Sequence, residues 1–144
     1  MEKQHALQQL EQLQKKLYAI HYACSAMNLD ADTVAPKNTS EGRGVALGVL
    51  AGEEQQLMIC PETRALLDEL DRQKDELDLL HRREVEELRR RCDQLTRIPA
   101  EEYIAYSELV NKAGDVWHKA KEKDDFAMFC PLLQELVEYN RKFA

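Results

Sequence analysis

The sequence predicts an all-α fold, an irregular bundle of about five or six helices that forms a single domain over residues 1–144. Apolar residues recur at steps of three and four in several separate segments, which is the period of an amphipathic helix. Only five glycines and four prolines are present, too few for the many turns of a β-sandwich or barrel. A hydrophobic share of 44% beside a charged share of 33% is typical of a globular chain rather than a disordered one.

The first helix is expected over residues 3–28. Its apolar residues share one face and are Leu7, Leu10, Leu13, Leu17, Ile20, Cys24 and Met27. Tyr18 and Tyr22 add apolar character on other faces of the second half, so we expect that half to be covered on several sides.

A loop is predicted next, over residues 29–39. Asp30, Asp32 and Thr33 favour side-chain bonds to the backbone, and Pro36 excludes a regular helix. Asn38 is the expected N-cap of the second helix, which we place over residues 39–58.

Four of the five glycines fall in this second helix, at positions 42, 44, 48 and 52. They do not form a dinucleotide-binding fingerprint, because the spacing is one residue too long and no strand precedes it. Gly44, Gly48 and Gly52 instead share one helix face. Each costs about 0.8–1 kcal/mol relative to alanine inside a helix, so this face is predicted either to pack unusually closely against a neighbour or to be mobile.

Proline marks the start of two later helices, since Pro61 and Pro99 both suit a first turn. The densely charged stretch over residues 71–78 is expected to be either a turn or an exposed turn of continuous helix, and a helix is expected over residues 79–97. The helix that Pro99 opens should bury Tyr103, Tyr106, Leu109, Val110, Ala113 and Trp117. Asp125 is the expected N-cap of a last helix over residues 126–143.

Charge and cysteine usage exclude several classes of function. The net charge of −7 argues against binding nucleic acid through a basic surface. The four cysteines form no CxxC pair, and no apolar run has the length of a membrane span or a signal core. We therefore expect a cytoplasmic chain with reduced thiols, which binds neither nucleic acid nor membrane.

The sequence contains no complete catalytic or metal site. It has no HExxH, no Gly-x-Ser-x-Gly elbow and no P-loop. His21 and His118 could meet across helices, but a lone histidine on a helix is more often a packed or surface residue. No residue is therefore assigned a catalytic or metal-binding role, and no cofactor is expected to bind this segment.

Three ordered stretches carry a resemblance to a known family. They are Arg97-Ile98-Pro99 with Glu101-Glu102, the helix from Ala113 through Trp117 to Ala120, and Asp124-Asp125-Phe126 with Phe129 and Pro131 before the charged end at Arg141-Lys142-Phe143. Together they resemble the amino-terminal region of the thermostable, Taq-type zinc carboxypeptidases. The chain departs from the family in having Leu29 where a tryptophan is common, and Val34-Ala35 where Met is usual before the proline.

The resemblance implies a function for the longer protein. Family members are metal-dependent carboxypeptidases that remove residues from the C-termini of peptides, are usually homodimers, and are about three times longer than this chain. Their zinc-binding HExxH and glutamate ligand lie downstream, so this segment would be inactive alone. It would cover the substrate cleft, docked on the remainder of the carboxypeptidase chain, with the loop of Asp30, Asp32 and Thr33 facing the cleft. The alternative is a standalone, non-catalytic helical interaction module derived from that family.

Overall fold

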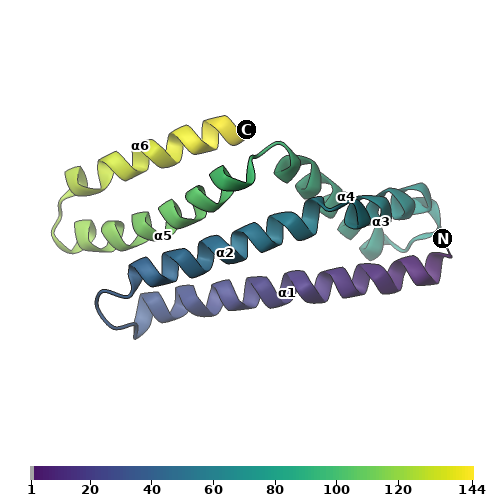
Figure 1. Cartoon of the computed structure of the whole chain (residues 1–144), viewed down its shortest axis with the longest axis horizontal. Coiled ribbons are helices and arrows are strands. Elements are labelled where there is room, and N and C mark those ends of the chain that lie inside the picture. Colours follow the sequence, from purple (N-terminus) through teal and green to yellow (C-terminus); the bar gives the residue numbers. More distant parts are fainter. Residues whose placement is uncertain (1) are drawn as a thin grey trace. The chain divides into compact units, whose positions relative to one another are not determined.

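Figure 1 shows the computed structural model of the protein, which describes residues 2–144. Over that range the chain forms six α-helices, one short 3-10 helix and no strand. The elements are α1 (Lys3–Thr33), α2 (Ser40–Ile59), α3 (Pro61–Arg72), η1 (Lys74–Glu76), α4 (Leu79–Thr96), α5 (Ala100–Glu122) and α6 (Phe126–Phe143). The predicted all-α fold with five or six helices is confirmed.

Contacts between Cα atoms divide the chain into two compact units. Unit 1 comprises Met1–Tyr22 and Glu53–Arg97, and unit 2 comprises Ala23–Gly52 and Ile98–Ala144. The helices α3 and α4 belong to unit 1 and α5 and α6 to unit 2, whereas α1 and α2 contribute to both. That residues 1–144 form a single domain stays a prediction.

Unit 1 has a dense leucine core. Leu10, Leu13 and Leu17 of α1 are buried at steps of three and four, as the sequence pattern predicts. The core is completed by Met58 of α2, by Leu66, Leu67 and Leu70 of α3, by Leu77, and by Val85, Cys92 and Leu95 of α4. Complete burial of each leucine contributes about 1.5–3 kcal/mol, so this core is the main source of stability in the unit.

Two of the predicted helix starts are confirmed by their capping geometry. Pro61 occupies the first turn of α3, where its missing N–H costs no hydrogen bond. The carboxylate of Asp125 accepts a 3.3 Å bond from the backbone N–H of Met128 and so caps α6. Asp78 caps α4 in the same way, and the hydrogen bonds from the backbone N–H and then the ring of His81 hold the pKa of Asp78 below its usual value.

The expected loop over residues 29–39 is wrong in its first half, because α1 continues through Thr33. The carbonyl of Asp30 accepts bonds from the backbone N–H groups of Val34 and Ala35, at 3.0 and 2.8 Å, and these close the last turn. A proline restricts only the residue directly before it, here Ala35. Pro36 therefore ends the helix later than the polar composition of this stretch suggests.

The predicted N-cap of α2 is also wrong. Asn38 has a φ of 67°, whereas an N-cap residue is extended, and α2 begins two residues later at Ser40. Asparagine tolerates this left-handed conformation, so Asn38 makes the turn and Thr39 precedes the helix.

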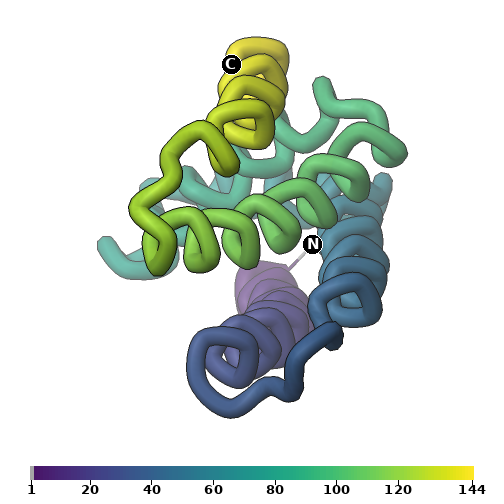
Figure 2. Tube along the Cα trace, turned by 90° about the vertical axis from the view of Figure 1, so that its left-hand side faces the viewer, coloured from purple at the N-terminus to yellow at the C-terminus, as the bar shows by residue number. Residues whose placement is uncertain are grey.

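In unit 2, α5 and α6 form an antiparallel hairpin (Figure 2). The ring of Tyr106 lies 5.6 Å from that of Tyr139 and 5.4 Å from that of Phe143. Lys142 Nζ donates a 2.7 Å bond to Glu102, which ties the end of α6 to the start of α5. These contacts fix the register of the two helices.

Four aromatic or aliphatic side chains that we expected to be covered are exposed. Tyr18 and Tyr22 of α1 are 68% and 64% exposed, and Val110 and Trp117 of α5 are 45% and 43% exposed. Periodicity identifies the apolar faces of a helix, but the number of neighbours decides how many of those faces are covered. Ala113, on the α6-facing side of α5, is buried as predicted.

Candidate functional site

The clearest polar site lies in unit 2, around the connection between α1 and α2. A groove of about 600 Å³ is formed by the last turn of α1, the connection itself, the first turn of α2 and the second half of α5. Its lining includes Asp32, Asn38, Arg43, Asp115 and His118. It is thus the place where the predicted loop residues meet charged groups of α5.

Arg43 holds the start of α2 to α5. Its side chain is only 10% exposed, and its Nε donates a 2.9 Å bond to Asn111 Oδ1 while Nη2 donates a 3.1 Å bond to Asp115 Oδ1. Asn111 Nδ2 in turn donates a 2.9 Å bond to the carbonyl of Ser40. Because charge-assisted hydrogen bonds contribute about 1.5–3 kcal/mol each, this network is a structural tie between the two helices.

Only one of the three residues predicted for the cleft-facing loop lines this groove. Asp32 Oδ1 lies 3.2 Å from His118 Nε2, and both side chains are about half exposed. The hydroxyl of Thr33 donates a 2.6 Å bond back to the carbonyl of Leu29, and Asp30 is exposed at the surface of α1. Asp32 with His118 is therefore the pair that can meet a ligand at this groove.

The glycines of α2 lie directly against α5. A Cβ atom built on Gly48 would lie 2.9 Å from Glu108 Oε1 and 3.2 Å from Ile104 Cγ2. The corresponding distances are 3.1 Å to Asn111 Nδ2 at Gly44 and 3.1 Å to Ile104 Cδ1 at Gly52. These side chains occupy the space that a methyl group at the glycines would need, and close packing and mobility of this face both stay predictions.

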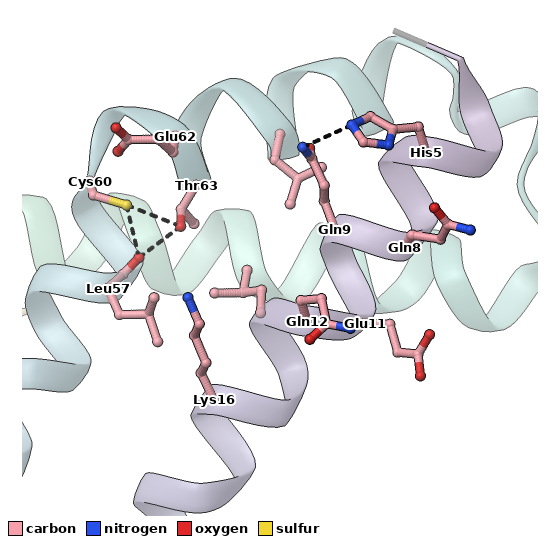
Figure 3. Close-up of a pocket in the computed structure, with 12 residues that line it drawn as sticks. His5, Gln8, Gln9, Glu11, Gln12, Lys16, Leu57, Cys60, Glu62 and Thr63 are labelled. Carbon is pink, nitrogen blue, oxygen red and sulfur yellow. Dashed lines mark hydrogen bonds between the residues drawn. The ribbon is translucent and has the colours of Figure 1, made fainter.

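A second groove, of about 810 Å³, lies in unit 1 between α1 and the start of α3 (Figure 3). The thiol of Cys60 donates to the carbonyl of Leu57 and to Thr63 Oγ1, each at 3.3 Å. Figure 3 shows the ring of His5 turned toward Gln9, 3.2 Å away, and not toward the thiol. The groove therefore does not pair a cysteine with a histidine base, as nucleophilic catalysis would require.

The two histidines considered for a shared site have separate partners in different units. His21 Nε2 lies 3.1 Å from Glu54 Oε1, whereas His118 contacts Asp32. Glu54 is buried, and it also accepts bonds from the guanidinium of Arg91. Among residues 2–144, no three His, Cys, Asp or Glu side chains are grouped so as to hold a metal ion.

Sequence reasoning missed the two charged residues that organise these units, the largely covered Arg43 and the buried Glu54. A signal was present for Arg43, since it is the only cation in α2 and stands between two glycines. Glu54 follows Glu53 at a helical position and has no such signal. Its burial depends on partners from α1 and α4 that no local pattern identifies.

Two solved structures each match nearly the whole of this chain. A crystal structure of BsuCP matches 96% of this chain with a TM-score of 0.90 and 31% identity, and the match covers 28% of that chain. Trypanosoma cruzi metallocarboxypeptidase 1 matches 94% of this chain with a TM-score of 0.68 and 30% identity, over 27% of its own chain. The fold thus points to the class of metallocarboxypeptidases.

Sequence comparison agrees. The model of the carboxypeptidase Taq (M32) metallopeptidase family matches residues 9–144. Carboxypeptidase 1 of Bacillus subtilis is 34% identical over 125 residues, which are 85% of this chain and 25% of that protein. Thermostable carboxypeptidase 1 of Pyrococcus furiosus is 28% identical over 130 residues, 90% of this chain and 26% of that protein. The chain belongs to the carboxypeptidase Taq (M32) metallopeptidase family, and the resemblance noted in its sequence is confirmed.

The chain spans about a quarter of the length of the curated relatives that it matches. None of the helices within residues 2–144 combines the length and the apolar character that crossing a membrane requires. Because the chain covers so little of these relatives, their activity, substrates and partners can only be proposed for it.

Proposed function

We propose that the chain is the amino-terminal, cleft-covering portion of a metal-dependent carboxypeptidase that removes C-terminal residues from peptides. The portion supplies no catalytic group of its own, because its sequence holds no HExxH motif. The zinc ion or other divalent metal of such an enzyme would be bound by the remainder of the polypeptide. A cytoplasmic location and a homodimeric full-length enzyme belong to the same proposal.

The observation that carries the proposal is the amount of apolar surface that unit 2 leaves uncovered. Within the described residues of that unit, nine large hydrophobic side chains are exposed: Leu29, Val34, Val45, Val49, Val110, Trp117, Phe126, Met128 and Val137. A standalone module would cover its apolar faces internally, since large exposed apolar surface favours association. Unit 2 instead has the surface of a part that packs against more protein.

The groove at Asp32 is the part of unit 2 that we assign to the substrate cleft. A cleft wall that selects peptide ends needs polar groups that can contact a passing peptide without holding a metal. Asp32 and His118 provide a carboxylate and an imidazole, both half exposed, on a scaffold fixed by Arg43. The close contact of the glycine face with α5 holds this wall in place.

The proposal is tested by grafting this chain into carboxypeptidase 1 of Bacillus subtilis in place of the matching region. We expect the graft to hydrolyse short peptides and to discriminate against long or folded substrates. A second enzyme that lacks the region should lose that discrimination, measured as the ratio of kcat/KM for a short peptide to that for a long one. An unchanged ratio in the shortened enzyme would refute the cleft-covering role.

Point variants of the graft separate the groove from general stability. Asp32→Asn should change the ratio, because it removes the charge that faces His118. Asp30→Asn is the matched control, since it makes the same change two residues earlier, outside the groove lining. Equal kcat/KM ratios in the Asp32→Asn and Asp30→Asn variants of an active graft would show that the groove does not contact the substrate.

A further inference from the structure

The α5–α6 hairpin of unit 2 has a second apolar side, distinct from the contact between its helices. Tyr106 and Tyr139 meet between the two helices, and steps of three and four from them reach Leu109 and Ala113 on α5 and Leu136 and Leu132 on α6. A step of one residue turns about 100° around a helix. Because the two helices are antiparallel and face each other, the same rotational step on each leads to the same side of the hairpin.

The residues reached by that step are almost all apolar. We define the apolar side of the hairpin as Val110, Gly114 and Trp117 of α5 with Phe126, Cys130, Leu133 and Val137 of α6. Phe126 is 65% exposed, and Val137 is 40% exposed. A Cβ atom on Gly114 would meet nothing within 4 Å, so this glycine leaves an open notch between Val110 and Trp117. On α6 the spacing of four, three and four residues makes a continuous stripe about 16 Å long.

The other side of the same hairpin is different in kind. One step in the opposite direction leads mainly to charged residues, which are Lys112 and Lys119 of α5 and Glu135, Glu138 and Lys142 of α6. The two sides of the hairpin therefore differ in composition. The charged side has the composition of a solvent-exposed surface, whereas the apolar side has that of a contact surface.

Charge at the two ends of the apolar side indicates what can cover it. Lys121 lies at one end, with Nζ 5.0 Å from the centre of the Trp117 ring, and Arg141 continues the α6 stripe at the other end. The defined side includes no Asp or Glu, although the chain as a whole carries a charge of −7. A second copy of the same side would place cations against cations in an antiparallel pairing, whereas an acidic partner would complement both ends.

We infer that the apolar side of the α5–α6 hairpin is the docking site for an amphipathic helix whose apolar stripe is flanked by acidic residues. A helix fits because two neighbouring apolar stripes, the one on α5 with an open notch at Gly114, accept the side chains of a third helix. That helix belongs to the part of the carboxypeptidase that this chain does not contain. Only this last assignment rests on the proposed function.

Trp117 makes the inference testable in the isolated chain, because it is the only tryptophan in the sequence and lies on the apolar side. The probe is a synthetic helical peptide of about 18 residues, long enough to span the stripe, with leucine at steps of three and four and glutamate on both flanks. We expect a saturable blue shift of Trp117 fluorescence. The same peptide with lysine in place of glutamate should bind about tenfold more weakly, since two attractive pairs become repulsive.

Two variants on α6 locate the binding surface. Val137→Glu should weaken binding of the glutamate peptide by about tenfold or more, because it puts a like charge into the stripe. Glu135→Gln is the control for a general charge effect on the opposite, charged side of the same helix and should bind as the parent does. Val110→Asp, on α5, repeats the test should Val137→Glu lose its helical circular dichroism.

Several outcomes would overturn the inference. Equal binding of the two peptides would refute the preference for an acidic partner. The absence of a saturable shift in Trp117 fluorescence would refute the docking site itself. A blue shift that appears without peptide as the chain concentration rises, with a doubled mass in light scattering, would identify a second copy as the occupant. None of these readouts depends on peptidase activity. The proposed function can therefore fail while the docking site is confirmed, or be supported while the docking site is refuted.

Discussion

The two units of this chain bury their apolar residues to very different extents. Among the described residues, unit 1 has twelve buried hydrophobic side chains and four large exposed ones, whereas unit 2 has four buried and nine exposed. The buried set of unit 1 is mainly leucine, and that of unit 2 is Leu47, Ala113, Ala120 and Leu132. Unit 1 therefore has a core of its own, whereas unit 2 relies more on hydrogen bonds and glycine contacts and leaves more of its apolar side chains exposed.

This difference teaches that the same helical pattern supports two kinds of packing. Both units are built from helices with apolar faces, but only unit 1 buries large apolar side chains from four helices, α1 to α4. In unit 2 the glycine face of α2 leaves room for the side chains of Ile104, Glu108 and Asn111 of α5. The contacts of these side chains with the glycines replace part of the burial that leucines provide elsewhere.

The largest expected effect that tests this comparison is loss of a core leucine. Leu70→Ala in unit 1 should lower the free energy of unfolding by about 3–5 kcal/mol, because Leu70 is fully buried. Leu132→Ala in unit 2 should cost about 2 kcal/mol, near the low end for leucine, since Leu132 is 8% exposed. Urea unfolding monitored by circular dichroism measures both losses. Equal losses would mean that unit 2 is packed as densely as unit 1.

A methyl group on the glycine face should be the next largest change. Gly48→Ala would place its Cβ 3.0 Å from Glu108 Cγ and 3.2 Å from Ile104 Cγ2, so α5 or these side chains must shift. We expect a net loss of about 1 kcal/mol, because the strain of overpacking exceeds the gain in helix propensity. A rise in the melting temperature of this variant would show that the contact between α2 and α5 is loose.

Gly114 provides the matched opposite case on α5. Its Cβ position is open, so Gly114→Ala should stabilise the chain by about 0.5–1 kcal/mol through helix propensity alone. Chemical unfolding of this variant beside Gly48→Ala separates contact from propensity. A loss of stability at Gly114 would mean that the notch on the apolar side is filled in the folded chain.

The smallest effect concerns thiol reactivity and leaves stability unchanged. Burial raises the pKa of the Cys92 thiol in unit 1, so its reactive thiolate is scarce at neutral pH. Cys130 lies on the partly uncovered α6 stripe of unit 2. Alkylation by iodoacetamide, followed by peptide mass spectrometry, should therefore label Cys130 well before Cys92. Labelling of Cys92 and Cys130 at the same rate would indicate that the core of unit 1 opens readily enough to expose its buried thiol.

Local signals in the sequence predicted most of the helices. The steps of Leu10, Leu13 and Leu17, the proline at position 61 and the carboxylate of Asp125 each act within one or two turns, and each has the expected role. The end of α1 was mispredicted, because Asp30 and Thr33 are turn formers by composition and yet bond within a continuing helix. Composition is a weak guide where the next proline lies several residues away.

The candidate site was predictable only in part. The glycine spacing showed that Gly44, Gly48 and Gly52 share a face, and Asp32 was singled out for the cleft. Neither pattern could identify α5 as the neighbour, because its residues lie more than fifty positions away in the chain. The partners of Arg43 and Glu54 were missed for the same reason.

The sequence by itself determined the all-α class, the starts of α3 and α6, the absence of an HExxH motif and the resemblance to the Taq-type carboxypeptidases, because each depends on residue type and short spacing. The tertiary structure alone decided which faces are covered: it buries Leu70, leaves Trp117 and Phe126 exposed, and places Asp32 beside His118. The physical reason is that hydrophobic burial and ion pairing depend on distances between segments remote in the chain. A periodic pattern specifies what a helix can bury, and only the packing of its neighbours specifies what it does bury.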